Sequence, residues 1–292
     1  MSDATMSPET AAELENGEGV PAEAQPEVIE DGVPHPYHLV NPSIWPMLSS
    51  FAAGLMATGG VMFMHEATGG GAVLILGLLA VLTCMFFWWK DVIYEAVVEK
   101  AHTPIAKLGM RYGMALFIAS EVMFFVAFFW AFFHSALFPT EAIGGVWPPV
   151  GIETVPAFGL PFLMTMILLL SGCTCTWAHA EIIRGRNDEA VKALAMTVGL
   201  GVLFTCVQVY EYGHVTYGFS ENVFTSAFYM ATGFHGFHVL VGTIFLLVCL
   251  FRAKAGHFTP DSHFGFEAAA WYWHFVDVVW LFLFVAIYWW GA

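Results

Sequence analysis

Long apolar runs separated by short polar connections dominate the sequence. A run of about 20 apolar residues is long enough to cross the hydrocarbon core of a bilayer as a helix. Seven such runs occur, at residues 44–64, 71–89, 112–133, 160–180, 193–213, 223–251 and 270–290. Because lipid offers the backbone no hydrogen-bond partners, each run is predicted to be a helix that closes its own hydrogen bonds. The pattern therefore predicts an all-α integral membrane protein with seven transmembrane helices.

Composition supports this class, and charge separates one segment from the rest. Hydrophobic residues make up 58% of the chain and charged residues 11%, unlike a soluble domain. Much of the net charge of −15 comes from residues 1–33, which hold nine acidic residues and no lysine or arginine. We predict a disordered acidic tail over residues 1–34, followed by a membrane domain over residues 35–292. The tail has the features of neither a signal peptide nor an Arg-rich transit peptide.

The nine lysine and arginine residues predict the orientation. They flank the second, fourth and sixth connections and are absent from the first, third and fifth. With seven crossings, the basic connections share a side with the N-terminus, and the positive-inside rule places that side in the cytoplasm. The C-terminus is then outside. A seven-helix receptor normally has its N-terminus outside, and a retinal protein needs a lysine in its last span, so neither class fits.

Glu121, His274 and Asp277 are polar side chains inside predicted spans, where a charge is costly. Glu121 lies ten residues from Arg111, about 15 Å along a helix and near the midplane. His274 and Asp277 are three residues apart, on one helix face, where they are able to satisfy each other. A buried carboxyl of this kind either exchanges protons or is a neutral acid hydrogen-bonded between helices. For Glu121 the residue alone leaves both interpretations open.

The twelve histidines raise the question of a metal site. His235 and His238 share a helix face and could hold a metal if a second helix added ligands. No intramembrane cysteine or histidine set pairs with them, so structural hydrogen bonding is the preferred interpretation. A membrane cytochrome that uses these two histidines is the alternative. The five cysteines show neither a disulfide framework nor a zinc spacing.

Small residues on two spans predict close helix packing. They are Ala53, Gly54, Ala57, Gly59 and Gly60 on the first span, and Gly233, Gly236 and Gly242 on the sixth. We expect most of them to serve packing within the chain.

Several motifs with polar residues at fixed places resemble subunit III of the haem-copper cytochrome c oxidases. In chain order they are HPYHLVNPSIWP (35–46), RYGMALFIASE (111–121), WPPVGI (147–152), TWAH (176–179), ATGFHGFH (231–238) and GFEAAAWYWHFVDVVWLF (265–282). The resemblance extends from about residue 35 to the end of the chain. The first motif, with two prolines before Trp45, also reads as an irregular entry peptide.

The resemblance implies that two N-terminal helices stand apart from a five-helix bundle, leaving a V-shaped cleft filled by phospholipids. Expected headgroup contacts near the cytoplasmic surface are Lys90, His102, Arg252 and His257. Expected tail and interface contacts are Trp88, Trp89 and Trp130. Surface anchoring without a specific lipid is the alternative for these residues.

The implied function is that of a non-catalytic core subunit of an enzyme that reduces oxygen to water and pumps protons. No cofactor is expected in this chain, because haem and copper belong to subunits I and II. Expected partners are subunit I as the main contact, subunit II, membrane phospholipids and, through the complex, cytochrome c, with no nucleic acid. For Glu121 the resemblance favours a structural or lipid-adjacent role over membership of the proton pump.

Two other functions remain as alternatives. Related quinol oxidases generally have a subunit III without the first two helices, which are present here. A stand-alone proton-coupled transporter would use Glu121 and Asp277, although the sequence shows no inverted repeat. The expected location is a bacterial inner membrane, with the mitochondrial inner membrane as the alternative.

Overall fold

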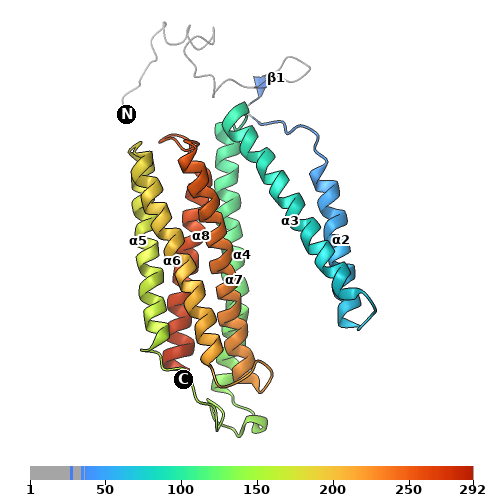
Figure 1. Cartoon of the computed structure of the whole chain (residues 1–292), viewed down its shortest axis with the longest axis vertical. Helices are drawn as coiled ribbons and strands as arrows, with labels where there is room; N and C mark the ends of the chain where they lie inside the picture. The colour runs from blue at the N-terminus through green and yellow to red at the C-terminus, as the bar shows by residue number, and fades with distance from the viewer. Residues whose placement is uncertain (1–26, 29–33, 36, 292) are drawn as a thin grey trace, which may run out of the picture. The chain divides into compact units, whose positions relative to one another are not determined.

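A computed structural model describes residues 27–28, 34–35 and 37–291 (Figure 1). The elements, in chain order, are β1 (Glu27–Val28), β2 (Pro34–His35), α2 (Trp45–Met64), α3 (Gly70–Tyr94), the π-helical turn η2 (Glu95–Glu99), α4 (Pro104–Leu137), the 3-10 turn η3 (Glu141–Ile143), α5 (Leu160–Ile183), α6 (Asn187–His214), α7 (Val223–Lys254), α8 (Phe264–Leu283) and the π-helical turn η4 (Phe284–Trp290). The two short strands pair antiparallel. Most of the predicted tail, residues 1–26 and 29–33, lies outside the described residues.

Seven helices in the described part of the chain are long and apolar enough to cross a membrane. They coincide with the seven apolar runs, so the prediction of an all-α protein with seven transmembrane helices is confirmed. Several helices extend beyond their runs. Helix α4 begins at Pro104 rather than near residue 112. Its first turns contain Lys107 and Arg111, which interrupt an apolar run but leave helical hydrogen bonding intact.

The chain divides into two compact units, residues 1–110 and 111–292. In the first unit, α2 and α3 pack as a hairpin at very short range. A Cβ atom on Gly59 would overlap the backbone of Leu74, and one on Gly77 would overlap the backbone of Met56. A Cβ atom on Gly70 would lie 2.6 Å from the backbone nitrogen of Phe63. Glycine is therefore required at these three positions for the two backbones to approach.

The prediction from small residues is confirmed in part. Gly59 is such a contact, as are Gly236, whose Cβ would overlap Gln208, and Gly242, whose Cβ would lie 2.8 Å from the Trp273 ring. Gly54 is different, since a Cβ there would meet no atom of the described residues within 4 Å, so it makes no such contact within the chain. A sequence window detects small residues but not the face of the helix that packs.

Residues 37–44 of the entry peptide are irregular, as predicted, while His35 belongs to β2 and α2 begins at Trp45. The Trp45 indole donates a hydrogen bond from Nε1 to Asp91 Oδ2 at 2.5 Å. Its ring stacks on Phe87 with centroids 5.8 Å apart and planes 5° from parallel. These contacts hold the start of α2 against the last turns of α3.

The second unit is a helix bundle (Figure 1). The span formed by α8 and η4 is the most buried of its membrane-spanning helices. Helix α8 packs against α5 and α7, and α6 packs against α5 and α7. Two buried tryptophans of α8 have their polar atoms satisfied by α5. Trp273 Nε1 donates to Ser171 Oγ at 3.1 Å, and Trp280 Nε1 donates to Thr165 Oγ1 at 2.9 Å. The bundle core therefore combines large aromatic surface with specific hydrogen bonds.

Large aromatic side chains connect the rest of α4 to this bundle. Phe129 meets Phe282 edge to face at 4.4 Å between centroids, and Phe125 meets the His238 ring at 4.9 Å. At one end, Phe132 is fully buried against Trp147 at 5.3 Å. Such edge-to-face pairs add to the free energy of burial.

Candidate functional site

Glu121 of α4 and His238 of α7 form a cross-helix pair inside the bundle. The His238 Nε2 and Glu121 Oε2 atoms are 2.8 Å apart. The Glu121 side chain is 21% exposed and the His238 side chain 7%. The rings of Phe124, Phe125 and Tyr272 surround the imidazole. The pair is thus a polar contact inside an aromatic shell.

The hydrogen bonds of His238 determine how many protons this pair holds. His238 Nδ1 lies 2.6 Å from the carbonyl oxygen of Phe234. A carbonyl only accepts, so Nδ1 must carry a hydrogen and donate it. One further proton must then lie between Nε2 and Glu121, either on the carboxyl or on the imidazole. In both cases the pair has no net charge, which is the arrangement an apolar environment favours.

His274 and Asp277 of α8 lie on one helix face, as predicted, but their contact is looser. His274 Nδ1 is 3.6 Å from Asp277 Oδ2, longer than a hydrogen bond. His274 Nε2 lies 3.3 Å from the Thr176 hydroxyl of α5. Asp277 is 6% exposed and its Oδ1 has no hydrogen-bond partner among the described residues. A Cβ atom on Gly172 would overlap Asp277 Oδ2, so α5 leaves room for the carboxyl only because residue 172 is glycine.

Among the described residues, no further metal ligand joins His235 and His238. His235 Nε2 donates to the carbonyl oxygen of Val276 at 3.2 Å, and both nitrogens of His238 have the partners given above. Within the described residues, neither belongs to a group of three possible metal ligands. The two histidines instead connect α7 to α8 and α4, consistent with the preferred structural interpretation.

Three further acidic residues in the second unit were not identified from the sequence. Glu211 is 1% exposed, and its Oε2 accepts a 3.0 Å hydrogen bond from Tyr288. Glu181 accepts from Arg184 at 2.9 Å and from Arg186 at 2.7 Å. Glu211 falls inside the predicted span 193–213, so a search for acids within spans would have found it.

The third of these acids, Glu267, also has an arginine partner. Arg111 donates from Nε and Nη2 to Glu267 Oε2 at 3.2 and 3.0 Å. Arg111 is the first residue of α4 that belongs to the second unit, and Glu267 lies in the first turn of α8. It therefore adds a charged cross-link to the aromatic contacts between these two helices.

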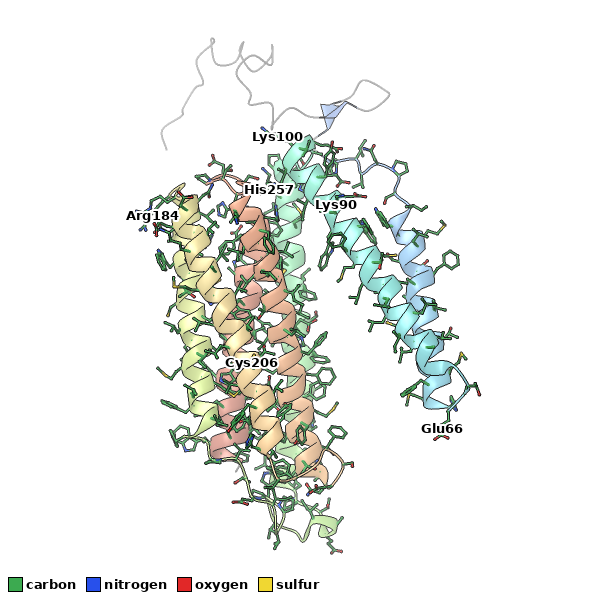
Figure 2. All side chains as sticks on the ribbon, in the orientation of Figure 1. Glu66, Lys90, Lys100, Arg184, Cys206 and His257 are labelled. Atoms are coloured by element: carbon green, nitrogen blue, oxygen red, sulfur yellow. The ribbon has the colours of Figure 1, made fainter. Side chains whose placement is uncertain are left out.

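The expected lipid contacts fall into separate groups. Lys90, Trp88 and Trp89 are exposed on α3 in the first unit. In the second unit, the Arg252 guanidinium lies 4.6 Å from the centre of the Phe258 ring. The His257 backbone N–H donates to the Arg252 carbonyl at 3.0 Å. Figure 2 shows His257 at the same end of the bundle as Arg184.

Two nitrogen atoms in the second group have no partner among the described residues. These are Arg252 Nε and His257 Nδ1, both buried. A Cβ atom on Gly265 would overlap Arg252 Nη1, so glycine leaves the space in which the guanidinium lies. Among the described residues, the Arg252 Nε–H therefore lacks an acceptor, and an unpaired N–H on a positive charge suits an anionic oxygen group.

Trp130 borders an apolar groove elsewhere in the second unit. The groove has a volume of about 510 Å³. Its lining residues are Val126, Phe129, Trp130, Phe133, His134, Leu137, Phe138 and Phe282. Its almost wholly apolar surface fits a hydrocarbon chain.

Comparison with known proteins identifies similar chains over most of the sequence. The family model described as "Cytochrome c oxidase subunit III" matches residues 35–292. A protein named cytochrome c oxidase subunit 3 from Marchantia polymorpha is 58% identical over 258 residues, covering 88% of this chain and 97% of the relative. The proteins of the same name from Arabidopsis thaliana and Cyanidium caldarium are 56% and 51% identical, covering 88% and 91% of this chain and 97% and 98% of the relatives.

Proposed function

The chain belongs to the cytochrome c oxidase subunit III family, and from this premise we propose that it is a non-catalytic core subunit of a proton-pumping oxidase. Family membership implies a complex with the other oxidase subunits. In the proposal, the chain packs mainly on subunit I, also adjoins subunit II, and binds phospholipid. It keeps the complex active over many turnovers and supports proton uptake. Haem and copper reside in the partner subunits, and cytochrome c delivers electrons to the complex.

The observation that carries the non-catalytic role is the pairing of three acids of the bundle with side chains on other elements. Glu121 pairs with His238, Glu211 with Tyr288, and Glu267 with Arg111. Each pair joins two different elements of the bundle, as expected for groups that hold helices together. A buried acid in such a pair stabilises packing whether or not a proton moves during turnover.

Glu121→Gln tests this interpretation. A glutamine has the same shape and presents an N–H to His238 Nε2, but it does not release a proton. We expect the intact complex with this substitution to retain proton translocation for each oxygen molecule reduced. Loss of translocation with normal assembly would instead make Glu121 part of the proton path.

Phospholipid binding is proposed at the Arg252–His257 site, and the separate apolar groove beside Trp130 is proposed to take an acyl chain of another lipid. The unpaired guanidinium beside Phe258 suits a phosphate, which accepts several charge-assisted hydrogen bonds. Lys90, Trp88 and Trp89 provide the corresponding basic and aromatic groups in the first unit. The lipid-filled cleft itself stays a prediction.

The matched variants for this site are Arg252→Ala and Lys254→Ala. Both remove a positive charge from the last turn of α7, but Lys254 is exposed and lies outside the proposed site. We expect lipid analysis of the purified complex to show loss of phospholipid for Arg252→Ala only. Equal retention in both variants would contradict a specific site and favour general surface anchoring.

The stabilising role predicts a particular kinetic result. Oxidase stripped of this chain should begin oxygen consumption at a measurable rate and then lose activity over successive turnovers, whereas the complete complex keeps its rate.

Mild purification from the native membrane, with a haem spectrum and an oxygen electrode, checks assembly and activity together. A colourless chain that purifies alone under gentle conditions would instead favour a proton-coupled transporter. A complex that oxidises quinol but not cytochrome c would favour the quinol oxidase alternative.

The location is a bacterial inner membrane in this proposal, with the mitochondrial inner membrane as the alternative. The seven apolar helices already establish a multi-pass membrane protein. Fractionation of the source cells, followed with an antibody to this chain, distinguishes the two membranes.

A further inference from the structure

Three possible metal ligands meet at one end of the first unit. His38 lies in the entry peptide, Glu95 begins the turn η2, and His102 lies in the connection that leads to α4. One ligand atom from each residue lies within 4.8 Å of those of the other two. The ligands come from three separate segments, so the cluster is a product of the tertiary structure rather than of helix periodicity.

The spacing is close to that of a metal site. The His38 Nε2 and Glu95 Oε2 atoms are 3.9 Å apart, too far for a direct hydrogen bond. The His38 and His102 rings meet at 64° with centroids 5.7 Å apart. In a tetrahedral zinc site with ligands about 2.1 Å from the ion, neighbouring ligand atoms lie about 3.4 Å apart. Small side-chain rotations would therefore bring the three atoms onto a shared ion.

The side chains are sheltered but accessible. The His38 side chain is 12% exposed and the Glu95 side chain 25%, and His102 is half-buried. A small ion could reach them, while part of the surrounding water is excluded. The first-unit hairpin positions Glu95 because the turn η2 continues directly from α3.

The composition of the cluster favours a metal over a phosphate. The Glu95 carboxylate would repel a phosphate, whereas two imidazole nitrogens and a carboxylate oxygen are donors that a transition metal accepts.

We propose that His38, Glu95 and His102 bind one divalent transition metal ion of the zinc class, with a water molecule completing the coordination. Two imidazoles and a carboxylate suit zinc and similar ions, whereas magnesium and calcium prefer oxygen ligands throughout. The ion fastens the entry peptide to the end of α3 and to the segment before α4. His102, which the resemblance implies as a headgroup contact, is assigned to the metal in this proposal, and the site uses none of Lys90, Arg252 and His257.

Zinc binding to the complete purified complex tests the site. The complex is treated with a chelator and then titrated with zinc alone, and bound zinc is measured by elemental analysis. The variants are His102→Gln and Glu95→Gln, with His65→Gln as the matched control because His65 is an exposed histidine of the same unit. Loss of a direct ligand should weaken zinc binding by more than loss of a ligand's hydrogen-bond partner, which typically costs about 10- to 100-fold. At zinc concentrations that fill the wild-type site, we expect both ligand variants to bind one equivalent of zinc less than the wild type. His65→Gln should bind as much zinc as the wild type.

Hydrogen exchange gives a second readout, specific to this segment. Zinc should slow amide exchange in residues 37–44 of the wild-type complex and of His65→Gln, with no such effect in His102→Gln. If His102→Gln does not assemble, Glu95→Gln and His38→Gln provide the same comparison. Identical zinc titrations for the wild type and the ligand variants, or no effect of zinc on exchange in the wild type, would overturn the proposal.

Discussion

At the scale of single residues, the pair of Glu121 and His238 is the contact whose loss should be most informative. Glu121→Leu would leave His238 Nε2 buried with an unsatisfied lone pair, at a cost of about 1–3 kcal/mol. Glu121→Gln has nearly the same shape and keeps an N–H donor for that nitrogen. We therefore expect Glu121→Leu to lower the thermal stability of the purified complex clearly more than Glu121→Gln. Equal stability of the two variants would show that the hydrogen bond seen at 2.8 Å contributes little.

The residue scale also shows what the sequence could and could not predict about the site. Burial of Glu121 and Asp277 followed from their positions in apolar runs, and the shared face of His274 and Asp277 followed from spacing. The partner of Glu121 could not be predicted, because His238 lies 117 positions away and on a different helix. Pairing of this kind depends on which helix faces meet, and periodicity within one helix does not specify that.

At the scale of elements, the α2–α3 hairpin predicts opposite outcomes for two glycines of one helix. Gly59→Ala would drive a Cβ into the backbone of Leu74, which the rigid partner helix does not accommodate, and such overpacking typically costs about 1–3 kcal/mol. Gly54→Ala meets nothing within 4 Å and raises helix propensity by up to about 1 kcal/mol. Thermal denaturation of the complex is monitored through protease cleavage of the connection at residues 65–69. Only Gly59→Ala should lower the temperature at which cleavage begins.

Helix α7 provides a second prediction at this scale. Asn222 Oδ1 accepts from the Thr225 backbone N–H at 3.1 Å, and Thr225 Oγ1 accepts from the Asn222 backbone N–H at 3.2 Å. This reciprocal pair satisfies donors that the first turn would leave unpaired. Asn222→Ala should therefore destabilise the bundle by about 1 kcal/mol, while Asn222→Asp, which keeps an acceptor, should be close to neutral. A similar loss in both variants would mean that the amide acts through another contact.

The elements themselves were largely predictable, and their ends were not. Seven apolar runs correspond to seven helices because a bilayer requires each crossing to be both apolar and internally hydrogen-bonded. The boundaries differ most at α4, where Lys107 and Arg111 belong to the helix but not to the apolar run. Hydrophobicity reports the part of a helix compatible with hydrocarbon, whereas its ends depend on local caps and contacts.

At the scale of the whole molecule, the distribution of charge leads to a prediction about orientation. In the second unit, the connection after α5 and the connection after α7 lie at the same end, since neighbouring helices run antiparallel (Figure 1). Arg184, Arg186, Arg252 and Lys254 belong to this end. The connection between α4 and α5, which contains Glu153, lies at the other end of α5 and has no lysine or arginine. The positive-inside rule assigns the end that is richer in lysine and arginine to the cytoplasm.

Labelling with a membrane-impermeant maleimide tests that orientation. Lys254→Cys and Glu153→Cys place a thiol at opposite ends of the bundle, both at exposed positions. Because the basic end should face the cytoplasm, we expect Lys254→Cys to be labelled only in inverted vesicles and Glu153→Cys only in right-side-out vesicles. The wild type serves as the background, since Cys173 and Cys206 are exposed but lie within spans that lipid would cover. The reverse pattern would place the basic end, and with it the Arg252–His257 site, on the opposite side of the membrane, and would contradict headgroup binding from the cytoplasmic leaflet.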